Sequence, residues 1–231
     1  MSAEFDRLAT DYDERLKDPV REYFAPDSEF FVRRKIDVLL AFARGLGVDT
    51  RRQTWLDVGC GKGQLLRAGQ PHFAAVQGCD VSTAMIDGAR DLHVVAQTGP
   101  DRIPFADRSV DWVTAVCVYH HVEPCDRGRL TAEIRRVLKP GGIFAVVEHN
   151  PLNPAVQLIV RRTPVDEHAI LLTAGRARRV LRDAGFDVLG TRNFLYVPQR
   201  LYRWAWIVER ALERLPLGGQ YAVFGRKTPT P

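Results

Sequence analysis

The residues with the clearest chemical potential stand in one short segment, where an acid precedes three alternating glycines. Residues 55–63 read WLDVGCGKG. Glycines at 59, 61 and 63 let the backbone turn tightly and approach a ligand closely, because no Cβ stands in the way. The helix expected from about Gln64 points free N–H groups into that turn, where an anionic group is stabilised. The segment therefore predicts a cradle for a small molecule.

The acid of this segment, Asp57, narrows the choice of ligand. A dinucleotide fold offers its turn to a pyrophosphate, with the fingerprint G-x-G-x-x-G. Here the third glycine comes one position early, and a carboxylate stands where a pyrophosphate would be repelled. A ligand with a cationic amine, a sulfonium and one carboxylate suits the site better. S-adenosylmethionine is such a ligand, and a nicotinamide dehydrogenase is disfavoured on the same grounds.

The elements that must position this turn alternate along the chain. Helices are expected at 29–46, 64–68, 83–90, 127–138, 173–184 and 199–215. Strands are expected at 54–58, 75–79, 93–97, 111–118, 143–148, 186–191 and 220–225. Such alternation predicts an α/β fold with a doubly wound parallel sheet and a site at the carboxyl ends of the strands. For the arginine-rich amphipathic helix at 199–215, core packing, a substrate-covering lid and a membrane-surface face all remain open.

Five segments in order carry a family resemblance. Residues 57–63 resemble motif I of the class I S-adenosylmethionine-dependent methyltransferases, and GCDVS at 78–82, IPFADRSVD at 103–111 and RVLKPGG at 136–142 are similar to later motifs. FDRLATDYD at 5–13 resembles the lid of the small-molecule branch that includes the ubiquinone and menaquinone methyltransferases. The match covers residues 1–150 well and the remainder in outline. It implies a Rossmann-like, seven-stranded, mostly parallel sheet whose last strand is antiparallel, with an N-terminal helical lid.

The domain organisation follows from length and resemblance together. A chain of 231 residues suffices for a single sheet with helices on both faces. We expect one methyltransferase domain over residues 1–231. It would comprise a helical lid at 1–48, a cofactor-binding core at 49–150, and substrate-side insertions with the closing strands at 151–231.

The resemblance also implies which residues hold S-adenosylmethionine. Asp57 and the backbone of Gly59 and Gly61 would take the methionine end, and Asp80 would bind the ribose hydroxyls. The further implied cofactor contacts are Tyr12, Val81, Met85, Asp101 and Cys117. Asp101 enters because Gly99 stands where the family commonly has an adenine-binding acid, so adenine recognition would shift to Asp101 or to backbone atoms.

A general base is needed only if the methyl acceptor carries a proton that must leave. Histidine is suited to take that proton, because its ordinary pKa is about 6.5. His121 follows the fourth strand, His149 follows the fifth, and His168 lies in the variable region after it. These three are the candidate catalytic residues, with His149 favoured, and a mechanism that relies on proximity alone remains open.

Composition restricts the function less sharply. The net charge of +5 raises the question of nucleic acid. Base-modifying relatives carry an Asn/Asp-Pro-Pro-aromatic motif after the fourth strand, whereas residues 118–121 read VYHH, so a small-molecule substrate is favoured over nucleic acid.

The four cysteines show neither disulfide nor metal-ligand spacing, so no metal is predicted. We expect a cytoplasmic protein, because neither a signal peptide nor a transmembrane run is evident. The oligomeric state is left open.

The sequence thus predicts an S-adenosylmethionine-dependent methyltransferase. It would move a methyl group to an oxygen, nitrogen or carbon of a small-molecule acceptor, including a secondary or lipid-linked metabolite. Two alternatives remain: a non-catalytic S-adenosylmethionine-binding partner subunit, and an RNA-directed methyltransferase. The acceptor is set by lid and insertions, which fold-level analogy does not specify.

Overall fold

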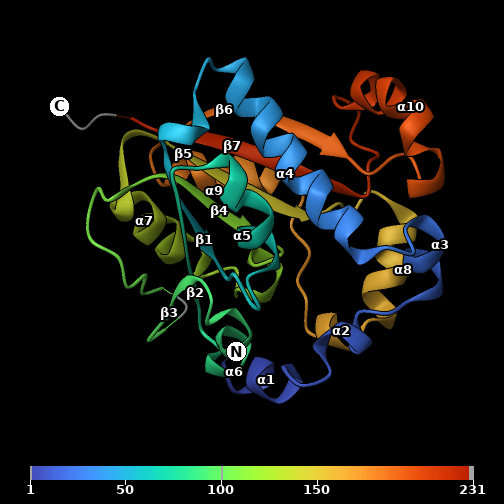
Figure 1. Cartoon of the computed structure of the whole chain (residues 1–231), viewed down its shortest axis with the longest axis horizontal. Helices are drawn as coiled ribbons and strands as arrows, with labels where there is room; N and C mark the ends of the chain where they lie inside the picture. The colour runs from blue at the N-terminus through green and yellow to red at the C-terminus, as the bar shows by residue number, and fades with distance from the viewer. Residues whose placement is uncertain (1, 100, 229–231) are drawn as a thin grey trace.

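A seven-stranded sheet in the order β3-β2-β1-β4-β5-β7-β6 organises the chain in the computed structural model, which describes residues 2–99 and 101–228 (Figure 1). The strands are β1 (Thr54–Val58), β2 (Ala75–Asp80), β3 (His93–Ala96), β4 (Val110–Val116), β5 (Leu138–His149), β6 (Phe186–Phe194) and β7 (Gln220–Lys227). β1 to β5 pair in parallel, and β7 runs antiparallel between β5 and β6. The expected sheet, mostly parallel with an antiparallel last strand, is confirmed.

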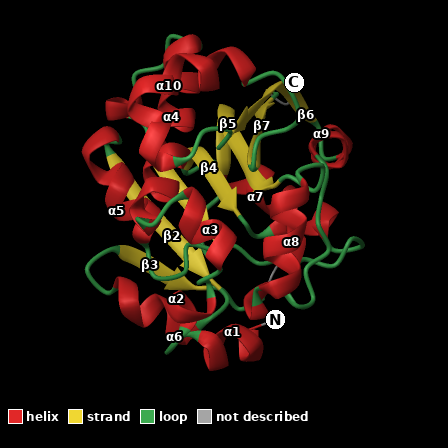
Figure 2. Ribbon diagram, turned by 90° about the vertical axis from the view of Figure 1, so that its right-hand side faces the viewer, coloured by secondary structure: helices red, strands yellow, loops and turns green. Residues whose placement is uncertain are grey.

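Helices cover both faces of this sheet (Figure 2). The α-helices are α1 (Ser2–Leu8), α2 (Tyr12–Arg15), α3 (Pro19–Phe24), α4 (Ser28–Gly45), α5 (Gln64–Gly69), α6 (Thr83–Ile86), α7 (Arg127–Val137), α8 (Pro154–Arg162), α9 (Ala174–Asp183) and α10 (Gln199–Leu212). The short 3-10 helices are η1 (Thr50–Arg52), η2 (Gln70–His72), η3 (Asp87–Ala89), η4 (Tyr119–His121) and η5 (Pro164–Asp166). Helices α4 and α5 pack on one face, and α7 and α9 pack on the other.

Two apolar clusters, one on each face, hold the sheet in place. On the α7 side, Leu130 and Ile134 recur at helical spacing and are fully buried against the strands. On the α4 side, the ring of Phe42 stacks on that of Phe224 in β7, with 3.6 Å between centroids. β4 lies between both clusters, which explains why most of its residues are apolar.

Several element boundaries differ from the sequence expectation. β5 begins at Leu138 rather than at 143, because Val110 already pairs with Leu138 before a register shift in β4. The helix expected over 83–90 divides into α6 and η3, whose Asp-Gly sequence has low helix propensity. The helix expected over 199–215 ends at Leu212 and is kinked at Ala205, where φ is −113° and ψ is 15°.

The topology identifies the edge of the sheet at which a ligand is expected to bind. The strand order reverses between β1 and β4, and ligands of open α/β sheets bind outside the carboxyl ends of the strands at such a point. The N-terminal range predicted as a lid contains two kinds of helix. α1 to α3 lie over this edge, whereas α4 also packs into the core through Leu39 and Phe42.

Candidate active site

The glycine turn after β1 adopts backbone conformations that favour glycine. The φ angles of Gly59, Gly61 and Gly63 are +75°, +50° and +74°. A Cβ added to Gly59 would lie 2.4 Å from Cγ2 of Val118, just after β4, so a side chain there would force Val118 to shift. Around Gly61, by contrast, a Cβ would meet no described atom within 4 Å. The turn therefore combines a close approach to β4 with open space over Gly61.

Asp57 is a buried carboxylate at the end of β1, with 2% of its surface exposed. The hydroxyl of Thr114 in β4 donates a 2.5 Å hydrogen bond to it, and Trp55 Nε1 donates to that hydroxyl in turn. Burial raises the pKa of Asp57 to about 7, although the Thr114 hydrogen bond and the charge of Lys35 oppose the shift. A cationic group placed beside this carboxylate would therefore favour its ionised form.

Asp80 ends β2 beside the glycine turn and is also buried. One carboxylate oxygen accepts from the backbone N–H of Gly61 at 2.8 Å, and the other accepts from that of Ser82 at 2.9 Å. Burial raises the pKa of Asp80, and these backbone hydrogen bonds oppose that rise. Because each carboxylate oxygen accepts more than one hydrogen bond, Asp80 retains capacity for a pair of ligand hydroxyls.

A cavity of about 570 Å³ opens over this edge of the sheet. The sequence-predicted residues that line it are Tyr12, Asp57, Gly59, Gly61, Asp80, Val81, Met85, Cys117, His121 and His149. The described residues of its wall include neither Asp101 nor His168. Asp101 lies in a turn beyond β3, where Gly99 bridges to Arg102, and His168 is exposed in the loop after η5.

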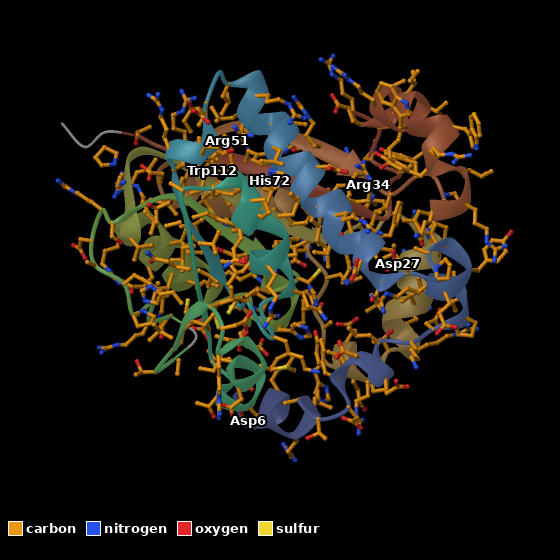
Figure 3. The ribbon with its side chains drawn as sticks, in the orientation of Figure 1. Asp6, Asp27, Arg34, Arg51, His72 and Trp112 are labelled. Atoms are coloured by element: carbon orange, nitrogen blue, oxygen red, sulfur yellow. The ribbon has the colours of Figure 1, made fainter. Side chains whose placement is uncertain are left out.

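The N-terminal segment closes over the cavity through specific contacts. Asp6 of α1, which Figure 3 labels, accepts a 2.6 Å hydrogen bond from the hydroxyl of Ser82 and a 3.2 Å bond from the Ala84 N–H. Asp13 of α2 pairs with the ammonium of Lys62 in the glycine turn at 2.8 Å. These contacts fasten the lid to the two loops that carry the predicted cofactor residues.

A buried charge network lies at the ends of β4 and β5, where His120 and Asp166 form part of the cavity wall. His120 Nδ1 lies 2.5 Å from Glu148, and its Nε2 lies 3.3 Å from Asp166 of η5. Burial opposes a charge on His120, yet Glu148 and Asp166 raise its pKa well above the ordinary value. The interactions with His120 also lower the pKa values of Glu148 and Asp166 below their ordinary values, although burial of the two carboxyls opposes this shift. His120 is therefore an imidazolium held between two carboxylates.

The other two histidines of the cavity wall, His121 and His149, have pKa values shifted in the opposite direction. Burial, together with the charge of His120, lowers the pKa of each to about 4. Both are therefore neutral near pH 7 and offer a lone pair. His149 Nε2 lies 3.8 Å from the thiol of Cys117, a weak partner that a substrate hydroxyl can replace. Cys117 itself has a φ of +57°, which is uncommon outside glycine and marks a constrained strand end.

The same cluster contains a group of atoms with metal-ligand spacing, which was not anticipated from the sequence. Ring nitrogens of His120 and His121 and a carboxylate oxygen of Asp166 lie within 4.8 Å of one another. Ion pairing between His120 and Asp166 uses these atoms without a metal. A metal could use these atoms only if His120 lost the proton that it shares with Asp166.

Sequence reasoning missed several residues that line the cavity, among them Lys35, Asp166 and Gln220. Lys35 lies on α4, and its charge acts on Asp57, Cys117 and His149. Gln220 begins β7, and its amide nitrogen donates to the Cys117 thiol at 3.5 Å. No local motif marks these positions. Asp166 and Gln220 belong to segments that follow β5, whereas Lys35 lies on α4, before the first strand.

The site combines a glycine turn with one acid at the end of β1 and a second at the end of β2, both at the carboxyl edge of the sheet. This arrangement is typical of class I methyltransferases. A family model described as "Methyltransferase domain" matches residues 56–146. The chain is 30% identical over 193 residues to a ubiquinone biosynthesis O-methyltransferase of Paracidovorax citrulli, covering 74% of this chain and 79% of that one. The chain belongs to the S-adenosylmethionine-dependent methyltransferases, whose cofactor is S-adenosylmethionine.

Further similarities agree with this assignment. A 2-methyl-6-phytyl-1,4-hydroquinone methyltransferase of Synechocystis is 31% identical over 63% of this chain and 52% of its own length. The chain spans about half the length of the first curated relatives it matches. The structure of an S-adenosylmethionine-dependent methyltransferase from Thermotoga maritima superposes with a TM-score of 0.68 at 17% identity, over 98% of this chain and 99% of that one, which supports the fold. Among residues 2–99 and 101–228, no helix combines the length and apolarity needed to cross a bilayer.

Proposed function

We propose that this protein transfers the methyl group of S-adenosylmethionine to a hydroxyl oxygen of a small aromatic acceptor of the hydroquinone type. Two relatives are named for hydroquinone or ubiquinone chemistry, which supports this acceptor class. The observation that carries the proposal is the pair of neutral histidines, His121 and His149, in the cavity that also contains Asp57 and Asp80. A hydroxyl must lose its proton during methylation, and a neutral imidazole can accept it.

The residues present fit S-adenosylmethionine. This cofactor supplies, when bound, a methyl group already activated by a sulfonium leaving group. The buried Asp57 would hold the cationic amine, and the open space over Gly61 would accommodate the methionine backbone. Asp80 would hold the ribose hydroxyls through charge-assisted hydrogen bonds, with Val81 and Met85 against the adenine. Tyr12 and Cys117 would complete the wall.

Lys35 is the residue we assign to the carboxylate of the cofactor. It lines the cavity from α4, and its positive charge already favours ionisation of Asp57. A zwitterionic amino-acid end needs one partner of each sign, and Asp57 and Lys35 would provide them. Because Asp57 is buried, its interaction with a cationic amine would be stronger than in water.

His149 is the residue we assign to the acceptor's proton. It follows β5, lines the cavity and lies beside Cys117 at the end of β4. The positive charge of His120 disfavours protonation of His149, whereas Glu148 and Asp166 favour it. A proton arriving on His149 would thus enter a region that holds two carboxylates. Closure of α1 over the cavity through Asp6 would exclude water while the reacting atoms are held in line.

An acceptor panel tests the proposed function. The protein is incubated with methyl-labelled S-adenosylmethionine and, separately, a phytyl hydroquinone, a short-chain hydroquinone, an aromatic amine and a structured RNA. We expect label on hydroquinone oxygen, with His149→Ala reducing turnover. Cofactor binding without label in any acceptor would favour the non-catalytic partner subunit. Label in RNA alone would overturn the small-molecule assignment.

A further inference from the structure

Helix α10 carries its apolar side chains on the outside of the protein. The large side chains concerned are 48% to 75% exposed, and together we call them the α10 surface: Leu201, Trp204, Trp206, Ile207 and Val208. Leu201 and Trp204 precede the kink at Ala205, and Trp206, Ile207 and Val208 follow it, so both parts of the helix expose apolar side chains. Helix α10 projects from the body of the molecule beside α4 (Figure 1). Core packing, one of the alternatives that the sequence left open, therefore describes Tyr202 of this helix but not these exposed side chains.

The inward side of α10 is attached by polar contacts and by the ring of Tyr202, which packs edge-on against Phe30 with 5.5 Å between ring centroids. Glu209 is its one buried residue, and its carboxylate accepts hydrogen bonds from the backbone N–H groups of Leu195, Tyr196 and Val197. Arg34 of α4 pairs with Glu209 at 2.8 Å, and Figure 3 shows Arg34 on the side of α4 that faces α10. The helix is thus held in a fixed orientation with its apolar side outward.

The charges around the α10 surface are one-sided. Four exposed arginines flank it, namely Arg200, Arg203, Arg210 and Arg214. The helix and the turn after it contain two carboxylates, and both are engaged: Glu209 with Arg34, and Glu213 with Arg192 at 3.6 Å. Arg203 also lies over the ring of Trp204, with 4.6 Å to the ring centroid. Positive charge therefore borders the exposed aromatic side chains without a competing free carboxylate in this helix.

We propose that α10 is a membrane-surface anchor that lays its outward face into the headgroup boundary of an anionic bilayer. Tryptophan favours the bilayer interface, and arginine is attracted to anionic headgroups. A second copy of the chain fits less well, because a two-fold contact through the α10 surface would bring two sets of arginines together. A substrate lid fits less well too, because no described residue of α10 lines the cavity.

Intrinsic fluorescence with vesicles tests this anchor directly. Of the four tryptophans, Trp55 and Trp112 are buried in the core, so a vesicle-induced blue shift reports on Trp204 and Trp206. We expect a blue shift and co-sedimentation with vesicles of equal parts phosphatidylcholine and phosphatidylglycerol, weakened by salt, and little binding to phosphatidylcholine alone.

Matched variants distinguish binding through the α10 surface from nonspecific adsorption to the vesicles. Ile207→Gln should weaken vesicle binding about tenfold or more, whereas Ile170→Gln, at an exposed isoleucine elsewhere, should leave it unchanged. Arg203→Gln should weaken it about fivefold. No blue shift in the wild type, or equal binding to both vesicle types, would overturn the proposal. A stable dimer in solution that Ile207→Gln dissociates, without vesicle binding, would instead assign the surface to a second copy.

Discussion

Replacing Asp57 with asparagine should make the ligand-free protein more stable at high pH while weakening cofactor binding. The pKa of Asp57 in the folded protein is about 7, against an ordinary value of 3.8. Because the folded-state pKa is raised, the stabilising contribution of this group is present below pH 4 and is lost as the pH rises through 7. Three pKa units correspond to about 4 kcal/mol above pH 7. Asparagine keeps an oxygen for Thr114 and has no charge to bury.

Denaturant unfolding of wild type and Asp57→Asn at a series of pH values measures this effect. The free energy of unfolding of the variant should exceed that of wild type by up to about 4 kcal/mol at pH 8, and the two should converge toward pH 4. In calorimetry, the wild type should bind S-adenosylhomocysteine more weakly below pH 7, by up to about tenfold per pH unit, and Asp57→Asn should lose that dependence. A difference in unfolding free energy between the two proteins that does not change with pH would refute the assignment of a buried, destabilised carboxylate.

Three further changes probe the rest of the site. In calorimetry, Lys35→Gln should raise the Kd for S-adenosylmethionine about tenfold or more, as expected for loss of a charge-assisted hydrogen bond. The control Arg44→Gln, at an exposed arginine of the same helix, should leave that Kd unchanged. His149→Ala should lower kcat for a hydroquinone about a hundredfold or more, whereas His168→Ala should leave kcat unchanged. The wild-type kcat should not change between pH 6 and 8, because the pKa of His149 is about 4. Gly59→Ala should cost about 1–3 kcal/mol in thermal or denaturant unfolding, because of its positive φ and the contact with Val118; an unchanged stability would contradict the turn geometry.

The parts of the fold that the sequence predicted well depend on short-range patterns. The glycine turn, the acids at the ends of β1 and β2, and the strand–helix alternation are all set by neighbouring residues, so they can be interpreted locally. Boundaries were less accurate where pairing decides them. β5 starts at Leu138 because of its partner Val110 in β4, and no local signal reveals that pairing.

The parts of the site that the sequence left unassigned depend on contacts between distant segments. Lys35 and Asp166 reach the cavity from α4 and η5, on opposite sides of the cofactor core in sequence. The neutral state of His149 follows from burial and from the neighbouring His120 charge, and neither is visible in the residue type. Asp101 was expected at the adenine from its position after β3, yet the turn in which it lies does not contribute to the described cavity wall.

Calorimetric titration with S-adenosylmethionine of the wild type, Asp80→Asn and Asp101→Asn tests the central claim most directly. Both variants remove one carboxylate charge near the carboxyl ends of neighbouring strands, but Asp80 alone lines the cavity. We predict saturable binding to the wild type and to Asp101→Asn, and binding at least about tenfold weaker to Asp80→Asn. No binding to the wild type, or a loss in Asp101→Asn with Asp80→Asn unaffected, would contradict this account of the site.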